Sequence, residues 1–228
     1  MRKIALLAVV AFAAACGSSS DSGGSSGITG TVNGTPFSSA SEVALFGSAN
    51  TCEIALAPGV PLGLSMAVGA SSDVAWTCNE ALTCVEHKNS RMLSLIIARA
   101  NLVTGTAPGL AAGTYTFIDL ANIGTNPPNL TPDAQGNIAI FTADVSGLNA
   151  TCSSTGYSVS TGTLTLSAAG ANSLTGTVNI TLAGGAGTLS GTFTYSSCNT
   201  QAFDACAALN GITGGTGFDT CVGTPTCI

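Results

Sequence analysis

Cys16 has the clearest potential chemistry in this sequence, because it ends an apolar run and follows three alanines directly. Arg2 and Lys3 precede the run, which extends from Ile4 to Ala15. As a helix the run would span about 18 Å, too short for a bilayer core of roughly 30 Å. The pattern is therefore typical of a secretory signal peptide at residues 1–15.

The segment from Ala13 to Cys16 is open to two kinds of processing. The alanines suit ordinary cleavage and release, but the tetrapeptide also resembles a bacterial lipobox, in which the cysteine receives a lipid. Ala13 stands where Leu is the commonest choice. The sequence has nine cysteines, and lipidation of Cys16 leaves an even set of eight. We therefore predict a lipid on Cys16, and a freely secreted protein with an unpaired Cys16 is the alternative.

Residues 16–27 predict a tether, because Gly and Ser make up almost all of the segment after Cys16. A coil of this composition has an end-to-end distance of about 18 Å. Gly17 stands where an Asp would retain a lipoprotein at the inner membrane. We therefore expect a lipid-anchored protein of the cell envelope, at the outer membrane.

The other eight cysteines predict a disulfide framework formed in an oxidising compartment. They are Cys52, Cys78, Cys84, Cys152, Cys198, Cys206, Cys221 and Cys227. Spacing alone does not fix their connectivity. The pairs expected here are Cys78–Cys84, Cys152–Cys198, Cys206–Cys221 and Cys52–Cys227.

His87 is the one histidine, three residues after Cys84. Cys78, Cys84 and His87 are residue types that bind zinc, but thiolates rarely stay free in an oxidising compartment, which favours a disulfide. A serine–histidine–acid triad would also need His87, and no Gly-x-Ser-x-Gly motif accompanies it. The sequence therefore predicts no metal and no cofactor.

The acidic residues give no stronger signal. Asp133 to Asn137 could join a calcium site, but a turn between strands explains the segment equally well. A carboxylate pair for glycoside hydrolysis would have to come from distant strands, with Glu53, Asp119 and Asp144 as candidates. No local pattern supports such a pair, so we predict that the protein is not an enzyme.

The charge balance argues against nucleic acid as a partner. Removing Arg2 and Lys3 from the five basic residues leaves three against eleven acidic ones, a formal charge of −8. Nucleic-acid binding needs a basic surface. Abundant Gly, Ser and Thr with few Lys and Glu favours strands and tight turns over helices.

The clearest structural pattern lies between Ser160 and Ser196, where a strand of alternating residues recurs three times. The alternation predicts an antiparallel meander with one buried and one polar face. The predicted buried residues are Leu164, Leu166, Leu174, Val178, Ile180, Leu182, Leu189, Phe193 and Tyr195. Those facing water are Thr163, Thr165, Thr175, Thr177, Thr181, Thr192 and Thr194.

Other strands are predicted along the chain, with a hairpin turn at Asn33-Gly34. They cover residues 28–32, 43–46, 54–56, 92–98, 113–118 and 138–145, and the run at 92–98 is apolar enough to be buried on both faces. Residues 58–75 give no clear prediction, 76–87 predict an excursion and 122–136 a loop. A short helix is expected within 201–210, ending before Gly211.

Together these elements predict one all-β domain over residues 28–228, an antiparallel β-sandwich braced by disulfides. Residues 199–228 form its cysteine-rich C-terminal extension. The sequence is similar to uncharacterised lipoproteins of myxobacterial type in the order of four motifs. These are residues 30–37, 113–116, 162–166 and 189–193, the last followed by Cys198. The resemblance implies the location and the fold, and it brings no activity.

Function is left open between three classes of protein. The first is a non-catalytic lipoprotein with a structural or interaction role, whose partner is an envelope protein or a polysaccharide. The second is a glycan- or ligand-binding module that uses its loops or the Thr face, since a flat hydroxyl array suits a regular surface such as polysaccharide or ice. The alternative is that these threonines have no binding role, because Thr is a favourable residue at solvent-facing strand positions. The third is an envelope hydrolase with scattered acids.

Overall fold

The fold is built almost entirely from strands. The computed structural model describes residues 27–53, 62–119, 130–198, 203–213 and 225–228, with the two-residue strands β1 (Val9–Val10) and β13 (Asp219–Thr220). The helices α1 (Cys78–Leu82) and α2 (Ala205–Thr213) are short, and a 3-10 turn covers Ala183–Gly185. The all-β prediction is confirmed, and α2 is the expected short C-terminal helix.

One ten-stranded sheet forms the body of the domain. Nearly all neighbouring strands are antiparallel, and only β8–β9 and β12–β4 pair in parallel. The strands are β2 (Thr29–Val32), β3 (Thr35–Ser38), β4 (Ser41–Cys52), β5 (Leu62–Ser72), β7 (Arg91–Asn101), β8 (Gly113–Phe117), β9 (Asn137–Leu148), β10 (Ser154–Ala169), β11 (Ser173–Leu182) and β12 (Thr188–Ser197).

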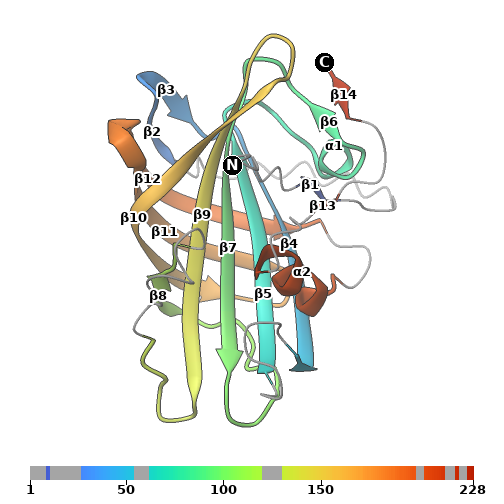
Figure 1. Ribbon diagram of the computed structural model, residues 1–228, viewed down its shortest axis with the longest axis vertical. Coiled ribbons are helices and arrows are strands. Elements are labelled where there is room, and N and C mark those ends of the chain that lie inside the picture. The colour runs from blue at the N-terminus through green and yellow to red at the C-terminus, as the bar shows by residue number, and fades with distance from the viewer. Residues whose placement is uncertain are drawn as a thin grey trace.

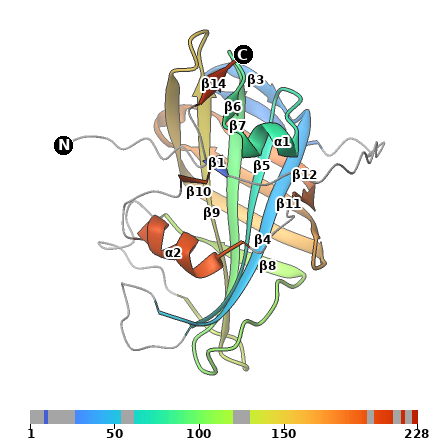
Figure 2. The same ribbon diagram turned by 90° about the vertical axis from the view of Figure 1, so that its right-hand side faces the viewer.

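The sheet closes on itself, because β11 pairs with both β10 and β12, and β12 also pairs with β4. Figure 1 shows β4, β5, β7 and β9 side by side along the long axis, with β11 and β12 crossing behind them. The side view in Figure 2 places β11 and β12 on the opposite side of the molecule from α2. The predicted antiparallel layers are thus two walls of one continuous sheet.

The main core fills the space between these walls. All nine meander residues predicted to be buried are buried, and Tyr195 and Phe193 belong to the largest fully buried side chains. From the opposite wall, Leu93, Leu95, Ile97 and Phe141 reach the same cluster. The period-2 alternation therefore identified the inner face of the meander correctly.

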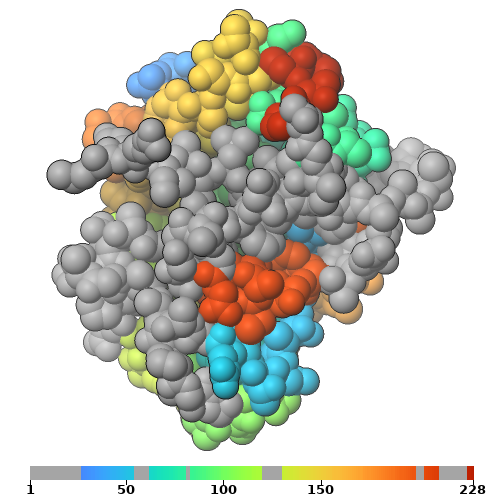
Figure 3. All heavy atoms as spheres, turned by 45° about the vertical axis from the view of Figure 1, so that its right-hand side comes forward, coloured from blue at the N-terminus to red at the C-terminus, as the bar shows by residue number. Residues whose placement is uncertain are grey.

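A second apolar cluster lies on the outer face of the long wall, under α2. Ala205 and Ala208 of the helix pack there with Leu64 and Met66 of β5 and Ala98 of β7. Figure 3 shows α2 in orange beside β4 in blue. Strand β7 therefore contributes to both clusters. The prediction that residues 92–98 are buried on both faces holds for the inner face, whereas on the outer face Ala98 is buried and residues 92, 94 and 96 are partly buried.

The predicted turn at Asn33-Gly34 joins β2 to β3. Asn33 and Gly34 have φ values of 49° and 76°, the positive values that a type I′ turn requires. One strand was not predicted, and one helix boundary differs from its prediction. Residues 62–72 form a strand, although no alternation marks it, since β5 is buried almost throughout. Gly211 lies within α2 instead of after it.

Several predicted features lie outside the described residues. These are Cys16, the tether up to residue 26, the strand at 54–56, and Pro127 and Pro128 of the loop. Within the predicted signal peptide, β1 pairs in parallel with β13. The two-residue strands β6 (Val85–Glu86) and β14 (Thr226–Cys227) also pair in parallel, so the C-terminus lies beside the segment that follows α1.

The cysteines form a disulfide framework, as predicted, but every predicted pairing is wrong. The structure contains Cys52–Cys206, Cys78–Cys198 and Cys152–Cys227, and Cys84 is also disulfide-bonded. The expected Cys78–Cys84, Cys152–Cys198, Cys206–Cys221 and Cys52–Cys227 bonds are therefore excluded. Two of the observed bonds tie the C-terminal extension to the sheet.

Topology explains these errors. An antiparallel meander of three strands begins and finishes at opposite ends of the sheet, so Cys152 before β10 and Cys198 after β12 are far apart. Cys78 begins α1 and packs with Cys198 near Leu45 and Val68. These neighbours are more than a hundred residues from Cys198 in the sequence, so the spacing of cysteines near one another in the chain could not predict the pairing.

Candidate functional site

A small cavity lies at one end of the sheet, between the α1–β6 segment and the ends of β5, β7 and β9. Trp76, His87, Met92 and Leu148 are among the residues that line it. Its volume is about 40 Å³, which is room for a few water molecules. The cavity is therefore much smaller than a site for a sugar or a peptide.

The local sequence positions a carboxylate beside His87 through the start of α1. Thr77 caps the helix: its hydroxyl accepts a hydrogen bond from the Glu80 amide at 3.2 Å, and the Glu80 carboxylate accepts one from the Thr77 amide at 2.8 Å. This reciprocal capping box holds Glu80 in one orientation. The Thr-x-x-Glu spacing at 77–80 is visible in the sequence, so this feature was missed although its signal is present.

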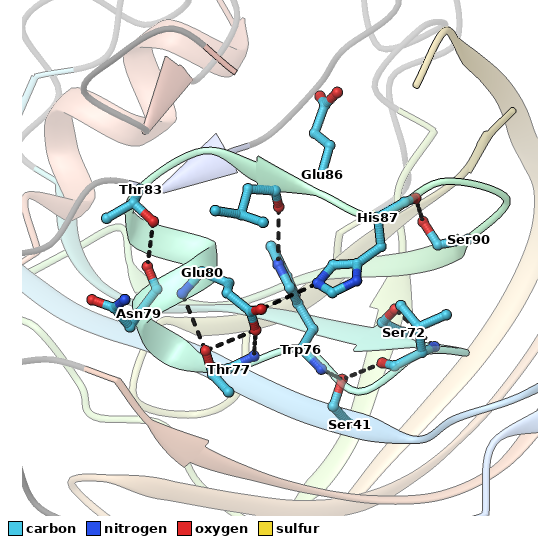
Figure 4. A network of polar contacts seen from close by, with 12 residues as sticks. Ser41, Ser72, Trp76, Thr77, Asn79, Glu80, Thr83, Glu86, His87 and Ser90 are labelled. Carbon is cyan, nitrogen blue, oxygen red and sulfur yellow. Dashed lines mark hydrogen bonds and ion pairs between the residues drawn. The ribbon is translucent and has the colours of Figure 1, made fainter. Parts of the chain in front are cut away.

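Glu80 and His87 face one another across the α1–β6 segment. Figure 4 shows the imidazole of His87 pointing toward the carboxylate of Glu80, and Nε2 lies 3.4 Å from Oε1. Trp76 donates its indole N–H to the carbonyl of Val85 at 3.3 Å, and Ser90 donates its hydroxyl to the carbonyl of His87 at 2.6 Å. These contacts fix the backbone on both sides of the histidine.

The electrostatics of Glu80 follow from the same contacts. Partial burial alone would raise its pKa, but the hydrogen bonds from the Thr77 amide and hydroxyl, together with His87, hold the pKa below its ordinary value. Glu80 is therefore a carboxylate at neutral pH. Ser90 donates its hydroxyl to the backbone of His87 and not to its ring, so these contacts do not assemble a serine–histidine–acid triad.

The cysteine–histidine metal site is not formed. Cys78 and Cys84 are both disulfide-bonded, so neither offers a thiolate to a metal beside His87. Among the residues that the structure describes, no group of three or more His, Cys, Asp or Glu side chains is placed to hold a metal ion.

Asp133 has a structural role in its turn. Its carboxylate accepts hydrogen bonds from the amides of Gln135 and Asn137, both at 2.9 Å, and it lies 3.3 Å from the Arg99 guanidinium. The backbone amide and the side chain of Asn137 are the main cause of the lowered pKa of Asp133. The turn between strands thus accounts for the segment that could have joined a calcium site.

Glu53 and Asp144 do not converge on one cleft. Asp144 on β9 pairs with Ser94 on β7, and the same row of the sheet continues through Ala70 on β5 to Val43 on β4. Val43 is ten residues from Glu53 along the same stretch of chain, which is roughly 30 Å in an extended strand. Asp119 follows β8, which pairs in parallel with β9, and the Phe117–Phe141 register places it near Ala143, the neighbour of Asp144 in the chain. Burial raises the pKa of Asp144 to about 6, but the register separates it from Glu53.

The exposed face of the β10–β12 meander carries rows of hydroxyl side chains. Six of the seven threonines predicted to face water are exposed, and Thr175 is partly exposed. The structure places them in register across three strands, opposite the buried core face. This face offers hydroxyl groups and no charge, so it can bind by hydrogen bonds alone.

Comparisons of this chain with protein families, with curated proteins and with solved structures found no match. Within the described part of the chain, no helix combines the length and apolar character needed to cross a bilayer.

Proposed function

We propose that this protein is a lipid-anchored lipoprotein of the bacterial cell envelope with a non-catalytic structural or interaction role. Lipid on Cys16 and the Gly/Ser tether after it would hold the folded domain near the outer membrane. The domain itself would then make the functional contacts.

The observation that carries the proposal is the oxidation state of the cysteines. All seven cysteines in the described residues are disulfide-bonded, which is typical of a protein that folds outside the cytoplasm. Seven is an odd number, so Cys84 has its partner in Cys16 or Cys221. If Cys16 carries a lipid on its sulfur, only Cys221 is left for Cys84.

The non-catalytic role is supported by the distribution of ionisable groups. His87, the partner of Glu80, lines a cavity with room for only a few water molecules, and Asp133 is used within a turn. Glu53 and Asp144 lie on distant parts of the wall. An envelope hydrolase would need acids that converge beside a space for its substrate. A glycan-binding role is a second candidate, which the hydroxyl face of the meander favours.

Mass spectrometry of the mature chain tests the proposal. The expected N-terminal peptide begins at lipid-modified Cys16, and the non-reduced digest contains a Cys84–Cys221 peptide. Detergent phase partitioning should place the wild type in the detergent phase and a Cys16→Ser variant in the aqueous phase. An unmodified Cys16, or a Cys16–Cys84 bond, would exclude the anchored form.

A further inference from the structure

The meander carries a regular block of nine exposed side chains in three rows. The strand register places Thr165, Thr177 and Thr192 in one row across β10, β11 and β12. The two other rows are Thr163–Asn179–Ser190 and Thr161–Thr181–Thr188. Neighbours are about 4.8 Å apart across the strands and about 6.7 Å apart along them.

The array continues onto the flanking strands. Thr114 of β8 pairs with Thr165, and Thr29 of β2 pairs with Ser190. Both are exposed, so hydroxyl-bearing residues extend the rows on both sides of the meander. The surface is therefore long in the direction across the strands, which is the direction in which a polymer could follow it.

The hydroxyl groups of the nine-residue block are available to a ligand. Within the described residues, the side chains of the block accept one hydrogen bond, from the Gly27 amide to Thr192 at 3.5 Å. Every hydroxyl both donates and accepts, as the hydroxyls of a sugar do. Propensity explains why Thr is tolerated in an exposed strand, but it does not require that eight of nine positions carry a hydroxyl and none a charge.

We propose that this face binds an extended, neutral polysaccharide. The inference rests on the proposed envelope location and names the partner of that interaction role. None of the nine residues is charged, in a chain with eleven acidic residues, so the face has nothing to pair with an anionic or a cationic polymer. The carboxylate of Glu42 lies beyond the block, where it accepts a hydrogen bond from the Thr194 amide at 2.7 Å.

Other occupants fit this face less well. Protein interfaces centre on aromatic or Arg side chains in apolar surroundings, and the block contains neither. A flat crystal surface such as ice would need a flat array, whereas neighbouring strands rotate by roughly 20–25° relative to each other. A polymer chain can follow that twist. Each hydrogen bond replaces one with water, so the affinity must come from many contacts along the chain.

Co-sedimentation of the detergent-solubilised mature protein with neutral polymers tests this. The probes are microcrystalline cellulose, chitin and dextran-coated beads, with alginate beads as the anionic comparison. The central row is removed by the triple variant Thr165→Val, Thr177→Val and Thr192→Val, which keeps the side-chain shape and the β-branching. The matched control is Thr35→Val with Thr226→Val, two exposed threonines outside the block.

The wild type and the control should be retained by at least one neutral polymer and not by alginate. The triple variant should bind that polymer about tenfold more weakly, because three central contacts of a multivalent array are lost. Unchanged melting curves show that the variants are folded. No retention by any neutral polymer, equal retention of the triple variant, a preference for alginate, or ice shaping without polymer binding each overturns the proposal. Because lipid on Cys16 is measured separately, these outcomes leave the anchored location standing.

Discussion

The disulfide between Cys78 and Cys198 joins the first residue of α1 to the residue after β12, across a sequence separation of 120. Cys198 also donates its amide to the carbonyl of Ala44 at 2.8 Å, so the end of β12 is held to β4 at the same place. The bond therefore fastens α1 to the point where the sheet closes. It also restricts a long segment of the unfolded chain.

Cys78→Ala and Cys198→Ala should each lower the free energy of unfolding by about 2–5 kcal/mol, the usual effect of removing a native disulfide. The two variants break the same bond, so the double variant should be no less stable than either single one. Urea unfolding with thiol titration measures this. Additive losses would contradict the pairing, as would a Cys78 variant that leaves Cys198 oxidised within the chain.

The meander was the most predictable part of the fold. Its inner residues alternate with Thr, Ser and one Asn along β11 and β12, so the residue type at each position indicates which face it lies on. Strand β5 was not predictable for the opposite reason. Both of its faces are buried, and its small residues pack against strands and a helix that come from elsewhere in the chain.

The pairing of the cysteines and the surroundings of His87 depend on long-range topology. Cys78 contacts Cys198 only because α1 lies over the end of β12, and no residue pattern near Cys78 predicts where α1 packs. The Thr rows could be read from the sequence, but their alignment into an array needed the strand register.

The hydroxyl groups of Tyr195 and Ser71 form a buried hydrogen bond of 2.9 Å between the two walls of the sheet. Tyr195→Phe should lower the free energy of unfolding by about 1–3 kcal/mol, because it leaves the Ser71 hydroxyl unpaired inside the core. The variant with both Tyr195→Phe and Ser71→Ala should lose less than the sum of the single losses. Equilibrium unfolding of the four proteins measures the difference, and strict additivity would show that the bond contributes nothing.

Gly69 leaves room for the ring of Tyr195. A Cβ at Gly69 would lie 2.4 Å from Cε2 of that ring, so Gly69→Ala should destabilise the domain by about 1–3 kcal/mol through overpacking. Gly156→Ala is the matched control, since a Cβ there meets nothing within 4 Å. Thermal unfolding should separate the two variants. Equal melting temperatures would mean that the ring of Tyr195 moves without cost.

Asp144 should make the domain less stable at neutral pH than at mildly acidic pH. Burial raises its pKa from the ordinary value of 3.8 to about 6. Between these values the folded state binds more protons than the unfolded state, so the contribution of this group to stability falls as the pH rises through that window. Above pH 6 the cost of the buried carboxylate is fully present.

Asp144→Asn should therefore gain stability relative to the wild type as the pH rises from 4 to 7, by on the order of 1–3 kcal/mol. Asp133→Asn is the control with the opposite sign. Hydrogen bonds from Asn137 lower the pKa of Asp133, so that variant should be less stable than the wild type at pH 7, and the difference should shrink as the pH falls below the ordinary value. Urea unfolding at a series of pH values measures both differences. A constant offset for Asp144→Asn across the series would show that its carboxylate is solvated in the folded state.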